Sequence, residues 1–366
     1  MPTYPFITLI LLIVHTSFAV EDHQHEIHAL CMPNHQPKHP AHISHLPHTN
    51  PHAPQQGSLH FGLVSQPYDH THIYRKTGIL AKGIKELTYE TLLVQTTHDQ
   101  ACFYPLLVDN IIQHSEKQLL LHLRDDATFH DQTPMHVDDV LYSYQQALTH
   151  FPPNLQTKLQ LLTIKDLGNH WMLITSKEPV TESLHALSHM SIAARRPPHM
   201  GSGPYRLADS TSSSYVEYEK NTSYWGKEHP YQKGRYNMDR ITYSYFSDSY
   251  SEHQAFLHQH IDLYIERSAH RWHQVRSNQQ HQYQNIPHPA SRYTQVLHFN
   301  HRQPMLQDSR VRQAISLALD AEHLNQWLFY QQYTPLKSFH SPNTQPSSPV
   351  DPLQQAHQLL EQAGWH

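Results

Sequence analysis

The chain has 366 residues, 38% of them hydrophobic, and this length suits two compact lobes better than one. Its formal net charge is -5 at pH 7, and no basic stripe is visible, which argues against nucleic acid as the main partner. The unusual feature is the presence of 37 histidines. Because histidine becomes charged as the pH falls through about 6.5, the net charge should depend strongly on pH.

Residues 1–19 have the pattern of a secretory signal peptide. An apolar run from Phe6 to Val14 precedes the sequence SFA, which ends at Ala19 and suits cleavage there. The run is too short to span a bilayer, which favours a signal peptide over a membrane anchor. It departs from the usual signal-peptide pattern in that no Lys or Arg precedes it. No later segment has a transmembrane pattern. We therefore expect export to the periplasm.

The chain contains two cysteines, Cys31 and Cys102. In an oxidising periplasm they could form a disulfide, but a sequence does not show whether their Cα atoms come within bridging distance. A disulfide and two unpaired thiols therefore both remain open.

Residues 20–56 are a His/Pro-rich N-terminal arm without a sustained hydrophobic period, and we expect an extended chain there. Several of its histidines recur every three or four residues, and neutral imidazole is a common ligand for Zn and Ni. The candidate metal ligands are His35, His39, His42, His45, His48 and His52. The favoured alternative is that the arm only samples a histidine enrichment found throughout the chain.

The hydrophobic patterns that follow predict a mixed α/β chain. Residues 57–64 predict a strand, 83–95 a helix or a strand, and 117–123 a strand with Leu119, Leu121 and Leu123 on one face. Further strands are predicted at 171–176, in a hairpin within 201–226, and at 240–246, 261–266 and 296–300. The predicted helices are 137–148, 180–192, 251–260, a long helix at 309–330 capped by Asp308 with Val311, Ile315, Leu319 and Leu324 as its buried stripe, and 353–364 closed by Gly364.

The stretch from His122 to Tyr144 gathers five aspartates and three histidines. Its possible chemical roles are a metal site (His130, Asp131, His136, Asp139) and an acid–base pair of carboxylates (Asp125 with Asp126, or Asp138 with Asp139). We favour a structural role instead. Asp138 and Asp139 would lie in the first turn of a helix, where a negative charge meets the positive end of the dipole.

Several segments carry a family resemblance. They are LTYETLL at 87–93, LLLHLRDDATFHDQTPMHVDDVLYSYQQAL at 119–148, GSGPYRL at 201–207, YEKNTSYWG at 218–226, DSRVRQAISLALD at 308–320 and AHQLLEQAGW at 356–365. Together they resemble the extracellular solute-binding proteins that serve peptide and nickel ABC importers. Other stretches, among them HALCMP at 28–33, KGRYNMDRITYSYF at 233–246 and IERSAHRW at 265–272, resemble the Yej-type branch of that family, which binds oligopeptides and microcin C.

The resemblance implies a two-lobed periplasmic binding protein fold, type II-like with an extra subdomain, that closes on its ligand. Lobe I would comprise residues 57–80 and 200–293, its subdomain residues 81–199, and residues 294–366 would begin lobe II. By the same resemblance the fold would continue well past His366, so we expect a truncated second lobe.

The resemblance also implies a peptide or peptide-like ligand that joins the protein as an added strand along residues 64–69. The candidate ligand-binding residues are Ser65, Asp69, Glu266, Arg271 and Trp272. Glu266 would offer the ligand a carboxylate, Arg271 a guanidinium and Trp272 an aromatic face. The alternative is that Glu266 and Arg271 only pair with each other while Trp272 packs.

Two turns depart from the family pattern, because Gln132 and Gln331 stand where glycine is usual. A residue other than glycine at positive φ costs roughly 1 kcal/mol or more, so the geometry of these turns could be altered.

The implied function is that of a monomeric periplasmic binding component that delivers its ligand to a permease in the inner membrane, without a cofactor. The sequence contains no GxSxG, HExxH, P-loop or dinucleotide motif, which argues against an enzyme. The alternatives are a truncated remnant without transport activity and a His-rich protein that binds Zn or Ni.

Overall fold

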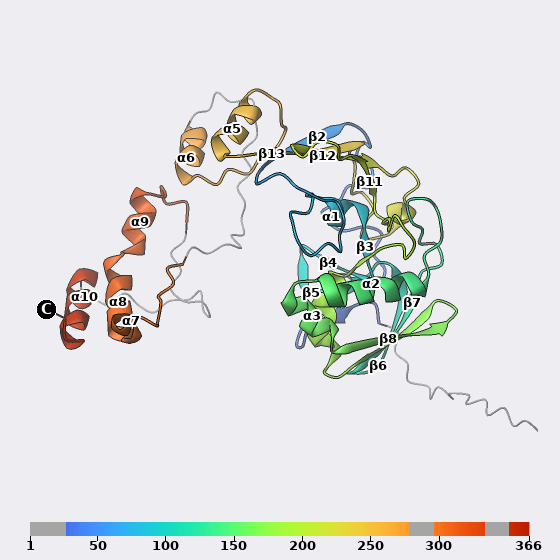
Figure 1. Cartoon of the computed structure of the whole chain (residues 1–366), viewed down its shortest axis with the longest axis horizontal. Helices are drawn as coiled ribbons and strands as arrows, with labels where there is room; N and C mark the ends of the chain where they lie inside the picture. The colour runs from blue at the N-terminus through green and yellow to red at the C-terminus, as the bar shows by residue number, and fades with distance from the viewer. Residues whose placement is uncertain (1–26, 278–295, 334–350, 366) are drawn as a thin grey trace, which may run out of the picture. The chain divides into compact units, whose positions relative to one another are not determined.

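The computed structural model describes residues 27–277, 296–333 and 351–365. The chain divides into two compact units, unit 1 over Met1–Tyr264 and unit 2 over Ile265–His366. In Figure 1, unit 1 runs from blue to yellow and unit 2 from orange to red.

Unit 1 combines short strands with short helices. Its strands within the described residues are β1 (Leu30–Cys31), β2 (Ser58–Val64), β3 (Glu90–Thr91), β4 (Leu93–Thr96), β5 (Asp99–Pro105), β6 (Val108–Ser115), β7 (Gln118–Leu123), β8 (Leu162–Gly168), β9 (Trp171–Ser176), β10 (Ser191–Ile192), β11 (Tyr205–Asp209), β12 (Tyr215–Lys220) and β13 (Arg240–Phe246). Its helices are α1 (Ile84–Thr88), α2 (Val137–His150), α3 (Pro153–Leu159), α4 (Leu184–Ser188) and α5 (Ser249–Leu257), with 3-10 turns η1 (Val180–Ser183) and η2 (Trp225–Glu228).

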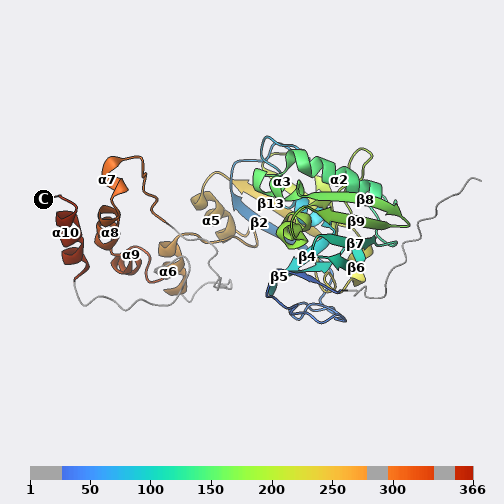
Figure 2. The ribbon, with the colours of Figure 1, turned by 90° about the horizontal axis from the view of Figure 1, so that it is seen from below.

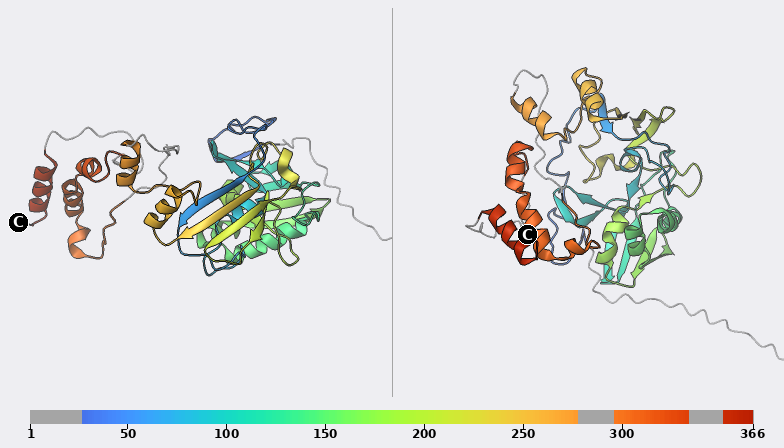
Figure 3. Two further views of the ribbon diagram at one scale, coloured as in Figure 1. Left: turned by 90° about the horizontal axis from the view of Figure 1, so that it is seen from above. Right: turned by 60° about the vertical axis from the view of Figure 1, so that its left-hand side comes forward.

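Two larger sheets organise unit 1. The antiparallel sheet has the strand order β6-β7-β9-β8, and α2 packs against it near β8 (Figure 2). The mixed sheet has the order β11-β12-β13-β2, and β13 and β2 run parallel (Figure 3, left). Smaller sheets pair β1 with β5 and β4, and β10 with β3.

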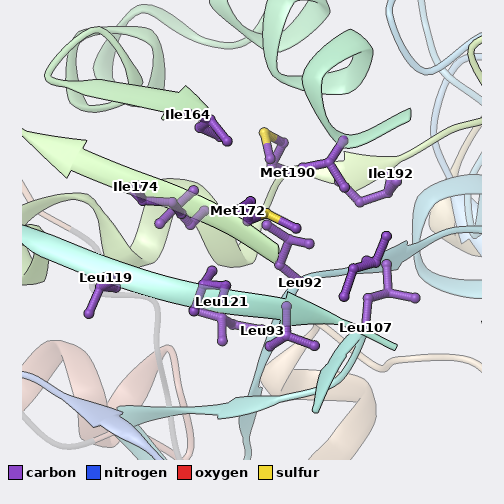
Figure 4. Close-up of a cluster of buried hydrophobic side chains, with 14 of the residues drawn as sticks. Leu92, Leu93, Leu107, Leu119, Leu121, Ile164, Met172, Ile174, Met190 and Ile192 are labelled. Atoms are coloured by element: carbon purple, nitrogen blue, oxygen red, sulfur yellow. The ribbon is translucent and has the colours of Figure 1, made fainter. Parts of the chain in front are cut away.

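The main core lies on one face of the antiparallel sheet. Side chains alternate along β7, and Leu119, Leu121 and Leu123 are fully buried, as predicted. Leu119 faces Ile174 across the sheet and Leu121 faces Met172, and Figure 4 shows these side chains among their neighbours. This alternation fixes the register of the sheet, because a slip by one residue would move the leucines to the opposite face.

The N-terminus of α2 explains the acidic stretch that precedes and begins this helix. Asp139 is nearly buried, and its carboxylate accepts hydrogen bonds from the backbone N–H groups of His136 at 3.0 Å and Arg195 at 2.8 Å. Asp138 pairs with Arg195 at 3.2 Å. The structural role predicted for these acids is therefore the one observed.

Unit 2 is helical within the described residues. Its helices are α6 (Ala269–Ser277), α7 (Pro304–Gln307), α8 (Ser309–Ala318), α9 (Ala321–Trp327) and α10 (Pro352–Gln362). Helices α8 and α10 pack side by side (Figure 1) and bury Val311, Ala314 and Ala356 between them.

The prediction of one long helix at 309–330 is wrong. Asp308 caps α8 as expected, but Asp320 adopts a left-handed conformation with φ 41° and caps α9, so the helix is broken there. The change of direction takes Leu319 and Leu324 out of the predicted buried stripe, and both are exposed.

Two predicted strands are absent. Residues 261–266 form only a single bridge, between Leu263 and Phe61, and residues 296–300 have no regular structure. A strand needs a hydrogen-bonded neighbour over several residues, and the described part of the chain offers none to either segment. The segment 83–95, left open between helix and strand, contains both, with α1 followed by β3 and the start of β4.

Both glutamines at the family's glycine positions keep the backbone conformation that glycine would favour. Gln132 has φ 66° and Gln331 has φ 59°. These turns therefore retain the left-handed geometry instead of rearranging, and a residue with a Cβ atom is strained there.

Candidate functional site

The carboxyl ends of two parallel strands meet at one edge of the mixed sheet. Strand β2 ends at Val64 and its parallel neighbour β13 ends at Phe246, which are partners in the register. The N–H of Ser65 still donates to the carbonyl of Phe246 at 3.2 Å, and beyond it residues 65–67 are exposed. In α/β folds, ligands bind at this end of the strands.

The outer edge of β2 is only partly covered. Odd-numbered residues of β2 direct their backbone groups to β13, so even-numbered ones point away from it. The carbonyl of His60 accepts from the N–H of Leu263 at 3.2 Å, and the N–H of Gly62 donates to the carbonyl of Leu263 at 3.1 Å. Val64 comes next in this alternation, and within the described residues its outward N–H and C=O groups meet no backbone partner.

This open edge depends on the absence of the predicted strand at 261–266. Had that segment continued alongside β2 beyond Leu263, its backbone would have covered Val64. The chain departs from β2 after a single bridge, so the backbone at the strand end has no further partner among the residues that the structure describes. Such a stretch of backbone can add an extended peptide as a further strand.

The predicted residues Ser65 and Asp69 both lie on the loop that follows β2. Ser65 is exposed, and its hydroxyl donates to the carbonyl of Gln66 at 3.1 Å. Asp69 is held within its own loop: its N–H donates to Ile79 at 3.0 Å, and its half-exposed carboxylate lies 4.0 Å from the guanidinium of Arg75. Both side chains are thus near the open edge in sequence, and their contact with a ligand stays a prediction.

A cavity of about 580 Å³ lies within unit 1, and the first residue of its lining in chain order is Thr71, two positions after Asp69. Its volume falls in the range of small-molecule sites. The lining includes two tyrosines and three histidines among aliphatic and polar residues, and it comprises Thr71, His72, Ile73, Tyr74, Ile84, Thr88, Tyr89, His130, Asp131, Pro198, His199, Met200, Gly201, Arg206 and Leu207.

Two histidines of the cavity have defined hydrogen bonds. His72 Nδ1 accepts from the backbone N–H of Tyr74 at 3.2 Å, so in the neutral ring the proton is on Nε2. Burial, and then the nearby imidazole of His199, lowers the pKa of His72. His199 donates from Nδ1 to the carbonyl of Ala194 at 3.1 Å, and its ring stacks on Tyr142. Burial and the nearby imidazole therefore favour the neutral form of His72, and the contacts of His199 fix the orientation of its ring.

The cationic group of the cavity is Arg206. Its terminal nitrogen donates to the carbonyl of His130 at 2.7 Å and to the side-chain oxygen of Asn221 at 2.9 Å, and its buried Nε has no partner among the described residues. The Asp131 carboxylate is bound to Thr133, and it also accepts from Arg196 at 3.1 Å. The cavity lining therefore combines three imidazoles, the guanidinium of Arg206 and the carboxylate of Asp131.

The ligand residues predicted in unit 2 lie close together. Arg271 pairs with Glu266 at 2.9 Å, and the Glu266 carboxylate, 7% exposed, also accepts from the N–H of Ser268 at 2.7 Å. Trp272 is half-buried on α6. The pairing foreseen as the alternative is present, and a role of these three residues in ligand binding remains a prediction.

The described part of the N-terminal arm, residues 27–56, belongs to unit 1 and packs on the remainder of that unit. Cys31 and Cys102 form a disulfide between β1 and β5, which resolves the question that the sequence left open. Leu46 is buried, and the buried His39 bonds through Nε2 to the hydroxyl of Thr96 at 2.9 Å. The described part of the arm thus contacts the rest of unit 1 and has no regular structure apart from β1.

The candidate metal ligands are not gathered into a site. Among the residues that the structure describes, no group of three or more His, Cys, Asp or Glu side chains is placed to hold a metal ion. Burial, opposed in part by Asp99, lowers the pKa of His39, and its ring packs against Tyr104. The same finding applies to the metal ligands considered between His122 and Tyr144.

His72, His199 and Arg206 are not among the ligand-binding residues predicted from the sequence. They come from separate segments, and in a chain with 37 histidines none of them stands out. The only available signal was the position of His72 shortly after the predicted ligand edge.

Across the described ranges, no helix is long and apolar enough to span a membrane.

An open backbone edge at the ends of parallel strands, within a mixed α/β unit, is the architecture of a ligand-binding lobe. The fold resembles the crystallised oligopeptide-binding protein AppA of Bacillus subtilis with a TM-score of 0.60 at 18% identity, over 86% of this chain and 65% of that one. Residues 103–366 match the family model of the bacterial extracellular solute-binding proteins, family 5. The chain belongs to this family.

The chain is also similar to curated proteins that are named as binding proteins. A protein of Brucella suis biovar 1 named as a binding protein is 29% identical over 340 residues, which cover 82% of this chain and 53% of the relative. The YejA protein of Agrobacterium fabrum, named a probable peptide-binding protein, is 27% identical over 332 residues, again 82% and 53% of the two chains. The chain thus spans about half the length of the curated relatives that it matches.

Proposed function

We propose that this protein binds oligopeptides or peptide-like compounds in the periplasm, as a monomer, and delivers them to the membrane permease of an ABC importer. The family supports a solute as the cargo, and the name of the Agrobacterium relative supports a peptide. The activity consists of binding and transfer, without a chemical step.

The observation that carries the proposal is the outward backbone of Val64 at the end of β2, which meets no backbone partner in the described part of the chain. A peptide that adds there as a strand is held through its main chain, so affinity depends little on its side chains. This suits a transporter that accepts many sequences. The cavity of about 580 Å³, which lies in the same unit, would receive one side chain or a terminal carboxylate, with Arg206 as its cationic partner.

Substitution of Val64 tests this directly. Val64→Pro removes the outward N–H, and proline is tolerated on an edge strand because that N–H has no partner in the sheet. Val64→Ala keeps the N–H and is the matched control. Calorimetric titration with a mixed peptide library should show weaker binding for the proline variant and unchanged binding for the alanine variant. Equal affinity of both variants would contradict the proposal.

Export is part of the same proposal. Residues 1–26 lie outside the described residues, so the predicted cleavage after Ala19 is tested by the mass of the mature chain in the periplasmic fraction. The disulfide between Cys31 and Cys102 supports an oxidising compartment, since such bonds are rare in the cytosol. A cytosolic chain of full mass would contradict export.

A further inference from the structure

A second cavity of unit 1, about 280 Å³, shares no lining residue with the larger one. It is referred to here as the cationic pocket, because most of its charged residues are basic. Its lining residues are Pro51, Gln55, Pro204, Lys220, Asn221, Thr222, Tyr224, Lys227, Glu228, Gln232, Lys233, Gly234, Arg235 and Tyr236.

The positive charges of the cationic pocket are poorly compensated. One carboxylate of the lining, Glu228, is bound to Lys233 at 2.8 Å. Lys220 donates to the neutral amide of Gln55, and burial lowers the pKa of Lys220, an effect that Asp239 opposes. A partly desolvated ammonium group with a neutral partner gains more from an incoming anion than a fully solvated one does.

Arg235 has the same kind of surroundings. Its guanidinium donates to the carbonyl of Tyr231 at 3.3 Å and to the side-chain oxygen of Gln232 at 3.1 Å, both uncharged, and lies 4.8 Å from the ring centre of Tyr236. These contacts hold the planar group in place, and because both hydrogen-bond acceptors are uncharged they do not neutralise it.

A buried carboxyl group lies beneath the pocket. Glu90 accepts a hydrogen bond from the hydroxyl of Tyr224 and lies 3.5 Å from the amide nitrogen of Gln232, and both of these residues line the pocket. Burial raises the pKa of Glu90 to about 7. Near neutral pH this carboxyl group is therefore partly protonated, and it offsets the charge of Arg235 only in part.

The N-terminal arm forms one wall of the pocket. Pro51 and Gln55 come from this arm, and Gln55 also donates to the side-chain oxygen of Asn237. Gly234, with φ 77°, lies so close to Asn50 that an added Cβ would come within 2.8 Å of its backbone. The arm, for which peptide binding supplies no role, is thus fitted tightly against the cationic side chains.

We propose that the cationic pocket binds a small dianion of the phosphate type, as a free ion or as a phosphomonoester. Lys220, Lys227 and Arg235 supply the charge, and Thr222 adds a hydroxyl donor. The volume admits a phosphate group with a small substituent and is too small for an oligopeptide, so this site is separate from the one proposed for the cargo.

Calorimetric titration of the full chain with inorganic phosphate tests the proposal, with a short phosphomonoester and citrate as parallel probes. Phosphate should bind with saturable heat, and Lys220→Gln and Arg235→Gln should each weaken it at least tenfold. Lys158→Gln is the charge-matched control, because Lys158 pairs with Glu182 on the surface of unit 1 and lines neither cavity, and it should leave phosphate binding unchanged.

Three results would overturn the proposal: no saturable heat at millimolar phosphate, equal weakening by all three variants, or tight binding of citrate in place of both phosphates. Arg235→Lys, which keeps the charge, should retain part of the affinity, and thermal melting of each variant confirms that it folds. Peptide affinity should be the same in all these variants. A failure of the phosphate site is therefore distinguishable from a failure of the peptide site.

Discussion

The disulfide between Cys31 and Cys102 gives the prediction with the largest effect on stability. The two residues are 71 positions apart, and Cys102 is fully buried. A cross-link that closes a loop of this length removes chain entropy from the unfolded state worth about 4 kcal/mol. Since whole domains are stable by only about 5–15 kcal/mol, the double variant Cys31→Ser with Cys102→Ser should be marginal.

Hydrogen exchange followed by mass spectrometry resolves this effect by region. Amides of β7 that exchange only by global opening should exchange roughly a thousandfold faster in the double variant, because each 1.4 kcal/mol is a factor of ten. Wild-type protein treated with a reductant should show the same faster exchange, because it also lacks the cross-link. Since it keeps the cysteine side chains, it separates the effect of the cross-link from that of the substitutions. Helices α8 and α10 of unit 2 serve as internal controls.

One outcome would refute this reasoning. If faster exchange were confined to residues 27–57, with β7 unchanged, the disulfide would hold only the arm and not unit 1 as a whole. The loop-entropy argument would then not apply to the global stability of the unit.

Three further predictions concern stability. Gln132→Gly should raise the free energy of unfolding by roughly 0.5 kcal/mol, because relief of the left-handed strain exceeds the added entropy of the unfolded chain, whereas Gln132→Ala should bring no gain in urea titrations. Asp139→Ala should cost roughly 2 kcal/mol, since two backbone N–H groups lose their acceptor, and a urea midpoint equal to wild type would contradict this. Unit 1 should lose stability as the pH falls from 6.5 towards 4, because burial lowers the pKa of His130 and His229 to about 4 while the unfolded chain takes up protons near 6.5. Glu90, with its pKa raised to about 7, acts in the opposite direction, because it takes up a proton in the folded state between pH 7 and 4.5 and so stabilises unit 1 as the pH falls. The variant Glu90→Gln should therefore lose more stability on acidification than wild type, as measured by urea midpoints at several pH values.

Local patterns predicted much of the fold. The alternation of Leu119, Leu121 and Leu123 identified a strand with one buried face, and the cap at Asp308 located the start of α8. These features depend on neighbours in sequence, whose spacing is visible without a structure. Asp320 was missed because an aspartate within a helical pattern can either stay in the helix or break it, and only the tertiary structure decides.

The site was harder to predict, because it depends on segments that meet only in three dimensions. The edge at Val64 could be placed from the family resemblance, but its uncovered state depends on where residues 261–264 leave β2. The same holds for Arg206, whose place in the larger cavity is set by contacts with distant residues. A sequence pattern carries no signal for such meetings.

The central claim is that the main chain of β2 forms backbone hydrogen bonds with an extended peptide ligand. The exchange rate of the Val64 amide measures this most directly. With a bound peptide, that N–H should exchange far more slowly, while the amides of Leu63 and Ser65, already directed towards β13, should change little. If peptide binds with measurable heat and the Val64 amide exchanges as fast as before, recognition takes place elsewhere and the account is wrong.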